Sequence, residues 1–245
     1  MLFLHGHTSG GAALKVLSGG AAQGLIASLA PKFKLQTGFD IEGEFGAVGA
    51  MAEKLRSGTP ADIVVLTAAT IAKLAEENRI VATSIADIGR VETAIAVRAG
   101  DPPVAIADAA TLRDALLAAD AIFVPDLSAS TAGIHVAKIL KRLGIADDVA
   151  DRLKILPNGA AAMRGLAESD ALRPIGCTQS TEIISTPGVV LSGPLPPGYA
   201  LSTVYMAALT TQGANARQAQ SLIDLLVGPD QREARERAGF LGSRK

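Results

Sequence analysis

Three turns in this sequence are built almost entirely of glycine, alanine and small hydroxyl residues. They span residues 18–24, 45–50 and 126–133, and each lies between a predicted strand and a predicted helix. Small side chains let a ligand approach the N–H groups at the start of a helix, which have no partner within the helix and can bind an anion. The same composition suits tight packing of a helix on a sheet, which we would favour for one such turn alone. Three turns together favour an anion-binding site.

The sequence lacks the usual motifs of hydrolases, metal sites and nucleotide-binding loops. It has no G-x-S-x-G, H-E-x-x-H or C-x-x-C motif and no Walker-type lysine. His135 and Cys177 are predicted to be ordinary packed residues. Asp126 and Glu182 are candidates to approach a ligand, but the sequence does not pair them as acid and base. We therefore expect no metal and no cofactor.

The composition is that of a globular chain without a strong charge bias. The chain has 245 residues, 49% of them hydrophobic, which is enough for one large or two smaller domains. A formal net charge of −1 argues against a general nucleic-acid binder. Aromatic residues make up 3% with no tryptophan, so a stacking platform for bases or sugars is not expected. The single cysteine excludes a disulfide within the chain.

Short apolar runs alternate with segments of helical periodicity, and this order predicts parallel sheets with helices on their faces. Strands or extended apolar segments are expected at residues 14–18, 40–45, 63–67, 93–98, 121–124, 154–156, 174–178, 189–191 and 201–209. Helices are expected at residues 21–34, 48–57, 68–78, 111–119, 132–143, 158–169, 214–226 and 231–238. Connecting segments are expected near residues 84–90 and 192–198.

The two connections predict an α/β chain that leaves one lobe, builds a second and returns. Residues 14–88 and 199–245 form the first lobe in this prediction, and residues 89–198 form the second. The cleft between the lobes is then the expected binding site. Residues 1–13 lack the pattern of a signal peptide and are predicted to be a flexible lead-in, so we favour a tail over a metal site for His5 and His7.

One segment carries a more specific resemblance. Residues 58–65, Gly-Thr-Pro-Ala-Asp-Ile-Val-Val, match a G-x-P-A-D-hydrophobic signature, and residues 131–134, 174–176 and 228–231 give further matches. From residue 14 to residue 240 the chain resembles the molybdate-binding components of ABC transporters, which are type II periplasmic solute-binding proteins. The resemblance implies two lobes, each a mostly parallel sheet flanked by helices, with the ligand between them.

The resemblance also implies where ligand donors would lie. Two family serines correspond to Ala21 and Val48, a family tyrosine corresponds to Gln179, and the backbone donors correspond to Ala132 and Ala161. All three hydroxyls are replaced, and each buried donor lost is worth roughly 1–3 kcal/mol, which disfavours molybdate. We expect a small di- or tricarboxylate instead. The candidate ligand-binding residues are Gly19, Gly20, Ala21, Gln23, Ala47, Val48, Gly49, Ser128, Ser130, Thr131, Ala132, Ala161 and Gln179.

The resemblance predicts the solute-binding component of an ABC-type transporter that closes on a small anion. The alternative is an enzyme like aconitate isomerase, which resembles the same family. The effector domain of a LysR-type regulator shares the fold and is set aside, because residues 1–13 hold no helix-turn-helix. We expect a monomer that does not bind nucleic acid, with a transporter permease as a possible partner. It would be periplasmic if a signal was removed and cytoplasmic otherwise.

Overall fold

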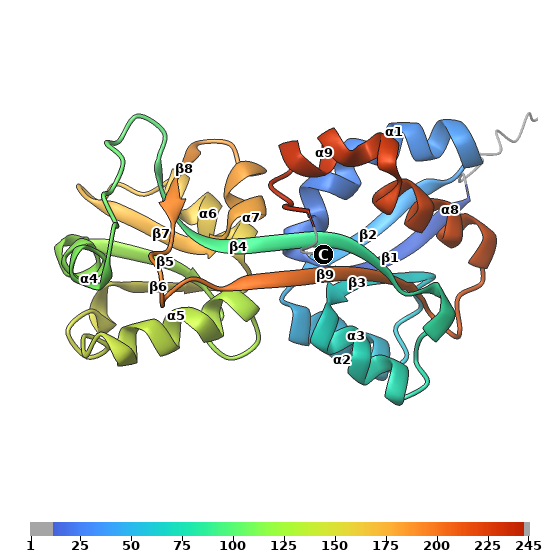
Figure 1. Ribbon diagram of the computed structural model, residues 1–245, viewed down its shortest axis with the longest axis horizontal. Coiled ribbons are helices and arrows are strands. Elements are labelled where there is room, and N and C mark those ends of the chain that lie inside the picture. Colours follow the sequence, from blue (N-terminus) through green and yellow to red (C-terminus); the bar gives the residue numbers. More distant parts are fainter. Residues whose placement is uncertain (1–11, 243–245) are drawn as a thin grey trace, which may run out of the picture.

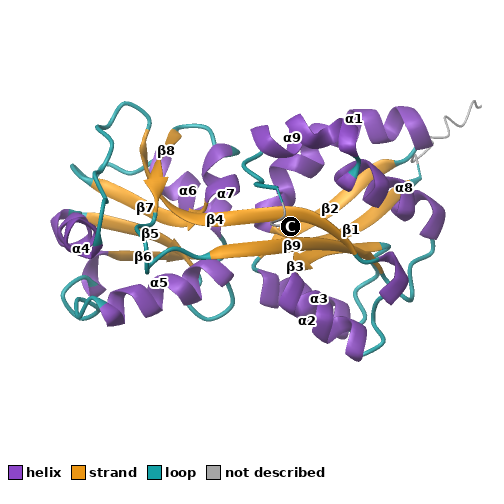
Figure 2. Ribbon diagram, in the orientation of Figure 1, coloured by secondary structure: helices purple, strands orange, loops and turns teal. Residues whose placement is uncertain are grey.

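Two α/β lobes lie side by side, and two long strands, β4 (Ala86–Arg98) and β9 (Ser202–Leu209), run between them (Figure 1). The structure is a computed structural model that describes residues 12–242. Helices cover both faces of the strands in each lobe (Figure 2). None of the helices in residues 12–242 combines the length and the apolar character needed to cross a membrane.

Lobe 1 is assembled from both ends of the chain. Its first part contains β1 (Ala13–Gly19), a 3-10 turn η1 (Gly20–Ala22), α1 (Gln23–Thr37), β2 (Asp40–Gly46), α2 (Val48–Arg56), β3 (Ile63–Thr67), α3 (Ala68–Glu76) and η2 (Ala82–Ser84). Its second part follows β9 and contains α8 (Ala216–Val227), η4 (Pro229–Gln231) and α9 (Arg232–Arg237). Strand β1 begins at Ala13, the last residue of the predicted lead-in, and residues 1–11, with His5 and His7, lie outside the described residues.

Lobe 2 is built from the middle of the chain. It contains α4 (Ala109–Ala118), β5 (Ala121–Pro125), α5 (Thr131–Arg142), η3 (Ala150–Arg152), β6 (Leu153–Leu156), α6 (Gly159–Ala167), β7 (Pro174–Gln179), α7 (Ser180–Ile184) and β8 (Val189–Pro194). Side chains cap two of these helices at their starts. Asp108 forms a capping box with Thr111 on α4, and Asn158 caps α6.

The predicted α/β fold with two lobes is confirmed, and the sheet is mixed. Strands run in the order β2-β1-β3-β9-β4-β7-β5-β6, with β8 paired to β4. The pairs among β1, β2 and β3 and among β5, β6 and β7 are parallel, as predicted. Strands β4, β8 and β9 add antiparallel pairs at the junction. The sheet therefore curls through β4 from one lobe into the other.

Strand β4 corrects the prediction for the first connection. Residues 86–90, which were expected to connect the lobes, pair with β9, and the strand continues from Thr93 to pair with β7. The second connection is also shorter than predicted, because Ser192, Gly193 and Pro194 belong to β8. The lobes are therefore joined by hydrogen-bonded strands, and any movement between them bends β4 and β9.

Each lobe has its own hydrophobic core. Lobe 1 buries apolar side chains of β1, β3, α1, α8 and their neighbours in one cluster. In lobe 2 the apolar residues of β4 alternate between two clusters: Ile95 and Val97 face α4 and α5, while Ala94 and Ala96 face α6. Side chains of a strand alternate between its two faces, so this sheet is covered on both sides.

The aspartate of the G-x-P-A-D signature has a structural position. Asp62 is buried at the start of β3, and its carboxylate accepts hydrogen bonds from the Lys15 N–H (2.8 Å), the Asn215 N–H (2.9 Å) and the Asn215 side-chain amide. It thereby ties β1 and β3 to the segment that leads into α8. Asp62 therefore stabilises lobe 1 from a buried position.

We predict that Asp62→Ala lowers the free energy of unfolding by about 3 kcal/mol, because it leaves buried N–H groups without an acceptor. Urea denaturation of the purified variant measures this loss. Asp170→Ala removes an exposed carboxylate and is the matched control, with an expected change within about 0.5 kcal/mol. Equal stability of the two variants would contradict the structural role of Asp62.

Candidate anion-binding cleft

A small polar cavity lies where the two lobes meet. Its volume is about 10 Å³, which is the room of a single water molecule. Residues of both lobes line it: Gly20, Gly46, Ala47, Val48 and Tyr205 from lobe 1, and Ser130, Thr131, Ala132, Asn158, Gly159, Gln179 and Glu182 from lobe 2. The lobes are therefore closed on each other in this structure.

Helix N-termini from both lobes converge on this cavity. The helices α1, through its η1 turn, α2, α5 and α6 all begin with residues of the lining. The residues that precede η1, α2 and α5 are Gly19, Ala47 and Ser130, and none of them caps its helix with a side chain. The first N–H groups of a helix have no partner within it and carry its positive dipole end. The cavity therefore presents N–H donors on two sides to an anion.

The structure brings seven of the thirteen candidate ligand-binding residues to the cavity. These are Gly20, Ala47, Val48, Ser130, Thr131, Ala132 and Gln179. The six others lie outside the lining, at Gly19, Ala21, Gln23, Gly49, Ser128 and Ala161.

Three of these outlying groups already have partners within the protein. The Gly49 N–H donates to the Ala129 carbonyl at 3.3 Å, across the lobes, and the Ala161 N–H donates to Asn158 Oδ1 at 2.9 Å. Both the N–H and the hydroxyl of Ser128 donate to Asp126 Oδ1 at 2.7 Å. The bond from Gly49 joins two segments that are far apart in the sequence, so no local sequence pattern could show it.

Gln179 is the clearest sign of a missing partner. Only 3% of this residue is exposed, and neither its amide oxygen nor its amide nitrogen has a hydrogen-bond partner. Thr93 lies directly opposite in the β4–β7 ladder, and its buried hydroxyl also has no partner. Buried polar atoms are almost always paired. Gln179 lines the cavity, so a ligand there could supply both an acceptor and a donor.

Glu182, to which the sequence analysis gave no role, lies in the wall of the cavity. Its Oε2 accepts a hydrogen bond from Thr178 Oγ1 at 2.6 Å, and the N–H groups of Gln179 and Gly159 also act on the carboxylate. A Cβ atom at Gly20 or Gly159 would collide with this carboxylate. Burial nevertheless raises the pKa of Glu182 above its ordinary value, because desolvation outweighs these hydrogen bonds.

Tyr205 is a site residue that the sequence analysis missed. It lies on β9, is buried, and packs edge-on against Phe240 with ring centroids 6.4 Å apart. Burial raises the pKa of its phenol above the ordinary value, so the hydroxyl stays protonated as a donor. The resemblance implied a tyrosine after the β7 strand, whereas here a tyrosine reaches the site from another strand.

The remaining sequence candidates have structural partners. Asp126 forms the turn before α5, and hydrogen bonds from Ser128 and Ala129 lower the pKa of its carboxyl. His135 Nε2 bonds to the Tyr199 carbonyl at 2.7 Å, and burial raises the pKa of the Cys177 thiol to about 12. Within residues 12–242, no three His, Cys, Asp or Glu side chains are grouped so that they could hold a metal ion.

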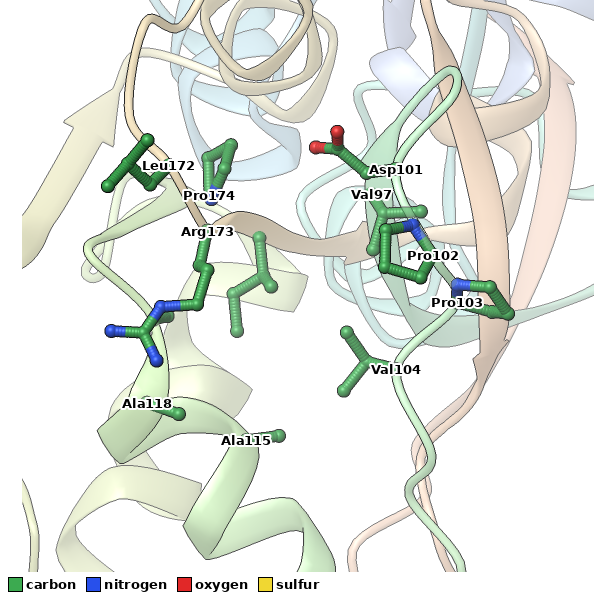
Figure 3. Close-up of a pocket in the computed structure, with 12 residues that line it drawn as sticks. Val97, Asp101, Pro102, Pro103, Val104, Ala115, Ala118, Leu172, Arg173 and Pro174 are labelled. Atoms are coloured by element: carbon green, nitrogen blue, oxygen red, sulfur yellow. The ribbon is translucent and has the colours of Figure 1, made fainter.

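A larger pocket lies elsewhere, on lobe 2, and differs in character. Its volume is about 260 Å³, and apolar side chains such as Pro102, Val104 and Leu172 line it (Figure 3). Its charged residues are engaged, Asp101 with Arg98 and Arg173 with Asp120. It therefore lacks the free donors that converge on the cleft.

Two lobes joined by paired strands, with helix N-termini meeting in the space between them, define a binding protein for a small solute. The chain belongs to the family of bacterial extracellular solute-binding proteins, whose model matches residues 14–241. It is thus a solute-binding protein.

Three comparisons extend this assignment. The periplasmic molybdate-binding protein of Azotobacter vinelandii has a TM-score of 0.79 at 19% identity, with 94% of this chain and 100% of that chain covered. The sulfate-binding protein SubI of Mycobacterium tuberculosis has a TM-score of 0.72 at 17% identity, with 94% and 86% covered. These two likenesses show the type II fold. An aconitate isomerase from Pseudomonas sp. is 26% identical over 238 residues, covering 93% of this chain and 87% of that enzyme.

The raised pKa of Glu182 predicts a pH dependence of stability. The folded protein holds this proton more tightly than the unfolded chain, whose carboxyl titrates near 4.5. The stabilisation is complete below pH 4.5 and is lost as the pH rises through the folded pKa. Wild type should therefore lose free energy of unfolding relative to Glu182→Gln over this window, measured by urea denaturation. Parallel pH profiles of the two proteins would contradict it.

Proposed function

We propose that this protein binds a small organic di- or tricarboxylate in the cleft between its lobes. The observation that carries the proposal is the Gln179 side chain, which is buried at the meeting point of the helix N-termini with both amide atoms unpaired. Uncapped helix starts at Ala47 and Ser130 favour a negatively charged ligand. The hydroxyls of Ser130, Thr131 and Tyr205 add further hydrogen-bonding groups to the lining.

The lining favours an organic anion over a bare oxyanion. A tetrahedral dianion only accepts hydrogen bonds, so it would leave the Gln179 oxygen without a donor. A polycarboxylate that carries a hydroxyl or a proton offers both donor and acceptor. Its carbon skeleton can also contact the apolar residues Ala47, Val48 and Ala132. The positions of the family hydroxyls, at Ala21, Val48 and Gln179, agree with this preference.

A carboxylate enters only if the lobes move apart, because the closed cavity holds about 10 Å³. Strands β4 and β9 are the hinge in this proposal, and separation breaks the bond between the Gly49 N–H and the Ala129 carbonyl. Closure around the ligand then restores it. In the cell, the closed monomer would deliver its ligand to a transporter permease, in the periplasm if the chain is exported.

A thermal-shift assay tests the ligand class. At 100 times its Kd, a ligand stabilises the fold by about 2.7 kcal/mol, and each kcal/mol raises the Tm by about 2–4 °C. We predict a Tm rise of about 5–10 °C with a small polycarboxylate such as citrate or tricarballylate and almost none with molybdate.

Substitutions of two glutamine residues, one in the cavity and one exposed, test where the ligand binds. Gln179→Leu should weaken polycarboxylate binding about tenfold or more in calorimetry, because it removes a donor to a charged group. Gln36→Leu changes an exposed glutamine of α1 and should bind like wild type. A large Tm rise with molybdate and none with any carboxylate would overturn the proposed ligand class. Equal affinities of the two variants for the polycarboxylate would show that it does not bind at Gln179.

Isomerase activity is a second candidate, favoured by the aconitate isomerase relative and by an acidic group in the cavity. Shifting the double bond of aconitate requires a group that removes a proton beside a carboxylate and a group that returns one. Glu182 and Tyr205 are the titratable residues of the lining.

Incubation with cis- or trans-aconitate, followed by chromatography, distinguishes the two functions. Our leading proposal predicts binding without interconversion. Interconversion at enzyme-like rates, abolished by Glu182→Gln, would establish the isomerase instead.

A further inference from the structure

Glu182 is the one acidic residue among those that line the cleft, and it is placed between the lobes. It belongs to α7 of lobe 2, yet its Oε1 packs against Gly20 of lobe 1 so closely that no Cβ fits there. On the lobe 2 side, its Oε2 packs against Gly159 and accepts the Thr178 hydrogen bond at 2.6 Å. The carboxyl is thus enclosed only because both lobes contribute a glycine, and its residue is 5% exposed.

No cation compensates a charge at this position in the described part of the chain. The groups that act on the carboxyl are neutral: the Thr178 hydroxyl of β7, the N–H of Gln179 at the start of α7 and the N–H of Gly159 at the start of α6. The titratable group that faces it from β9 is the Tyr205 phenol, which is also neutral. From η1, Gly20 presents no side chain. A carboxylate here would share a dry cavity with the anionic ligand, and two like charges so placed repel each other.

We propose that closure of the cleft on an anionic ligand is coupled to the uptake of one proton by Glu182. In the open protein the carboxyl loses its contact with Gly20 and is hydrated and ionised. On closure it takes a proton from solvent, and the neutral acid then offers an O–H donor inside the cavity. This inference rests on the proposed anion-binding function and explains how a cleft without hydroxyls at the family positions gains one more donor.

Proton uptake follows the direction that burial dictates. Removing water from around a carboxylate raises its pKa, and the closed structure has this raised value. Closure should therefore be favoured at low pH, and affinity should fall as the pH rises through the pKa of the closed form. At a pH between the pKa of the open form and that of the closed form, closure takes up one full proton. In that range the affinity should fall by up to about tenfold per pH unit.

Calorimetry with tricarballylate as the probe tests the coupling. This saturated tricarboxylate has no double bond to shift, so binding is measured without turnover. Titrations of wild type in two buffers of different ionisation enthalpy give the number of protons taken up per bound ligand. The same titrations with Glu182→Gln give the number of protons taken up by the ligand itself, and this number is subtracted from the wild-type value. Glu168→Gln, the same change at an exposed position of lobe 2, is the control.

We expect wild type and Glu168→Gln to take up close to one proton more than Glu182→Gln, which should bind with weaker pH dependence. Equal proton uptake by all three proteins would overturn the coupling while leaving carboxylate binding intact. Loss of binding in Glu182→Gln together with tighter binding of an amine-bearing ligand by wild type would show an ionised Glu182, and would also overturn it.

A failure of the underlying function would look different. If wild type binds no carboxylate, infrared spectroscopy still tests the proton on Glu182 in the absence of ligand. A carbonyl band of a protonated carboxyl that is present in wild type and absent in Glu182→Gln supports protonation in the closed form. Absence of that band, with scattering showing a closed molecule, would contradict it.

Discussion

The N–H groups at the start of a helix have no partner within that helix, and in this protein α2, α5, α6 and the η1 turn before α1 all begin at one cavity. This requirement shapes the surrounding structure. The turns must be short and made of small residues, so that backbone groups rather than side chains face the space between the lobes. The lobes must also be able to part, because the closed cavity excludes solutes larger than water. The paired strands β4 and β9 hold the lobes in register, and they are the hinge of the proposed opening.

The glycines of these turns also leave room for side chains of the protein itself. Gly20 and Gly159 contact the carboxylate of Glu182, and Gly19 packs against the Tyr205 ring. A composition that favoured ligand approach therefore also encloses two titratable side chains of the protein. Binding and packing are not alternatives at this cleft, because the same small residues allow the lobes to close tightly and leave donors facing inward.

The sequence predicted the local features of the fold and missed those that depend on distant partners. Strands such as Ile63–Thr67 were found, because runs of apolar residues are local signals. The first half of β4 was interpreted as a connection, since only pairing with β9 makes it a strand. Helix α7 has five residues, too few for a periodic pattern, and Tyr205 reaches the cleft from the far end of the chain. Gln179 was found through the family resemblance, although its unpaired amide is visible only in the structure.

The central claim is that the helix N-termini and Gln179 together hold an organic carboxylate between closed lobes. A crystal structure of the protein saturated with citrate, whose hydroxyl can donate to the Gln179 oxygen, tests it most directly. We predict one carboxylate group within hydrogen-bond distance of the Gln179 amide and of N–H groups from both lobes, at Val48 and Ala132. Citrate bound instead in the apolar pocket of lobe 2, or a cleft that holds only water at saturating ligand, would contradict it.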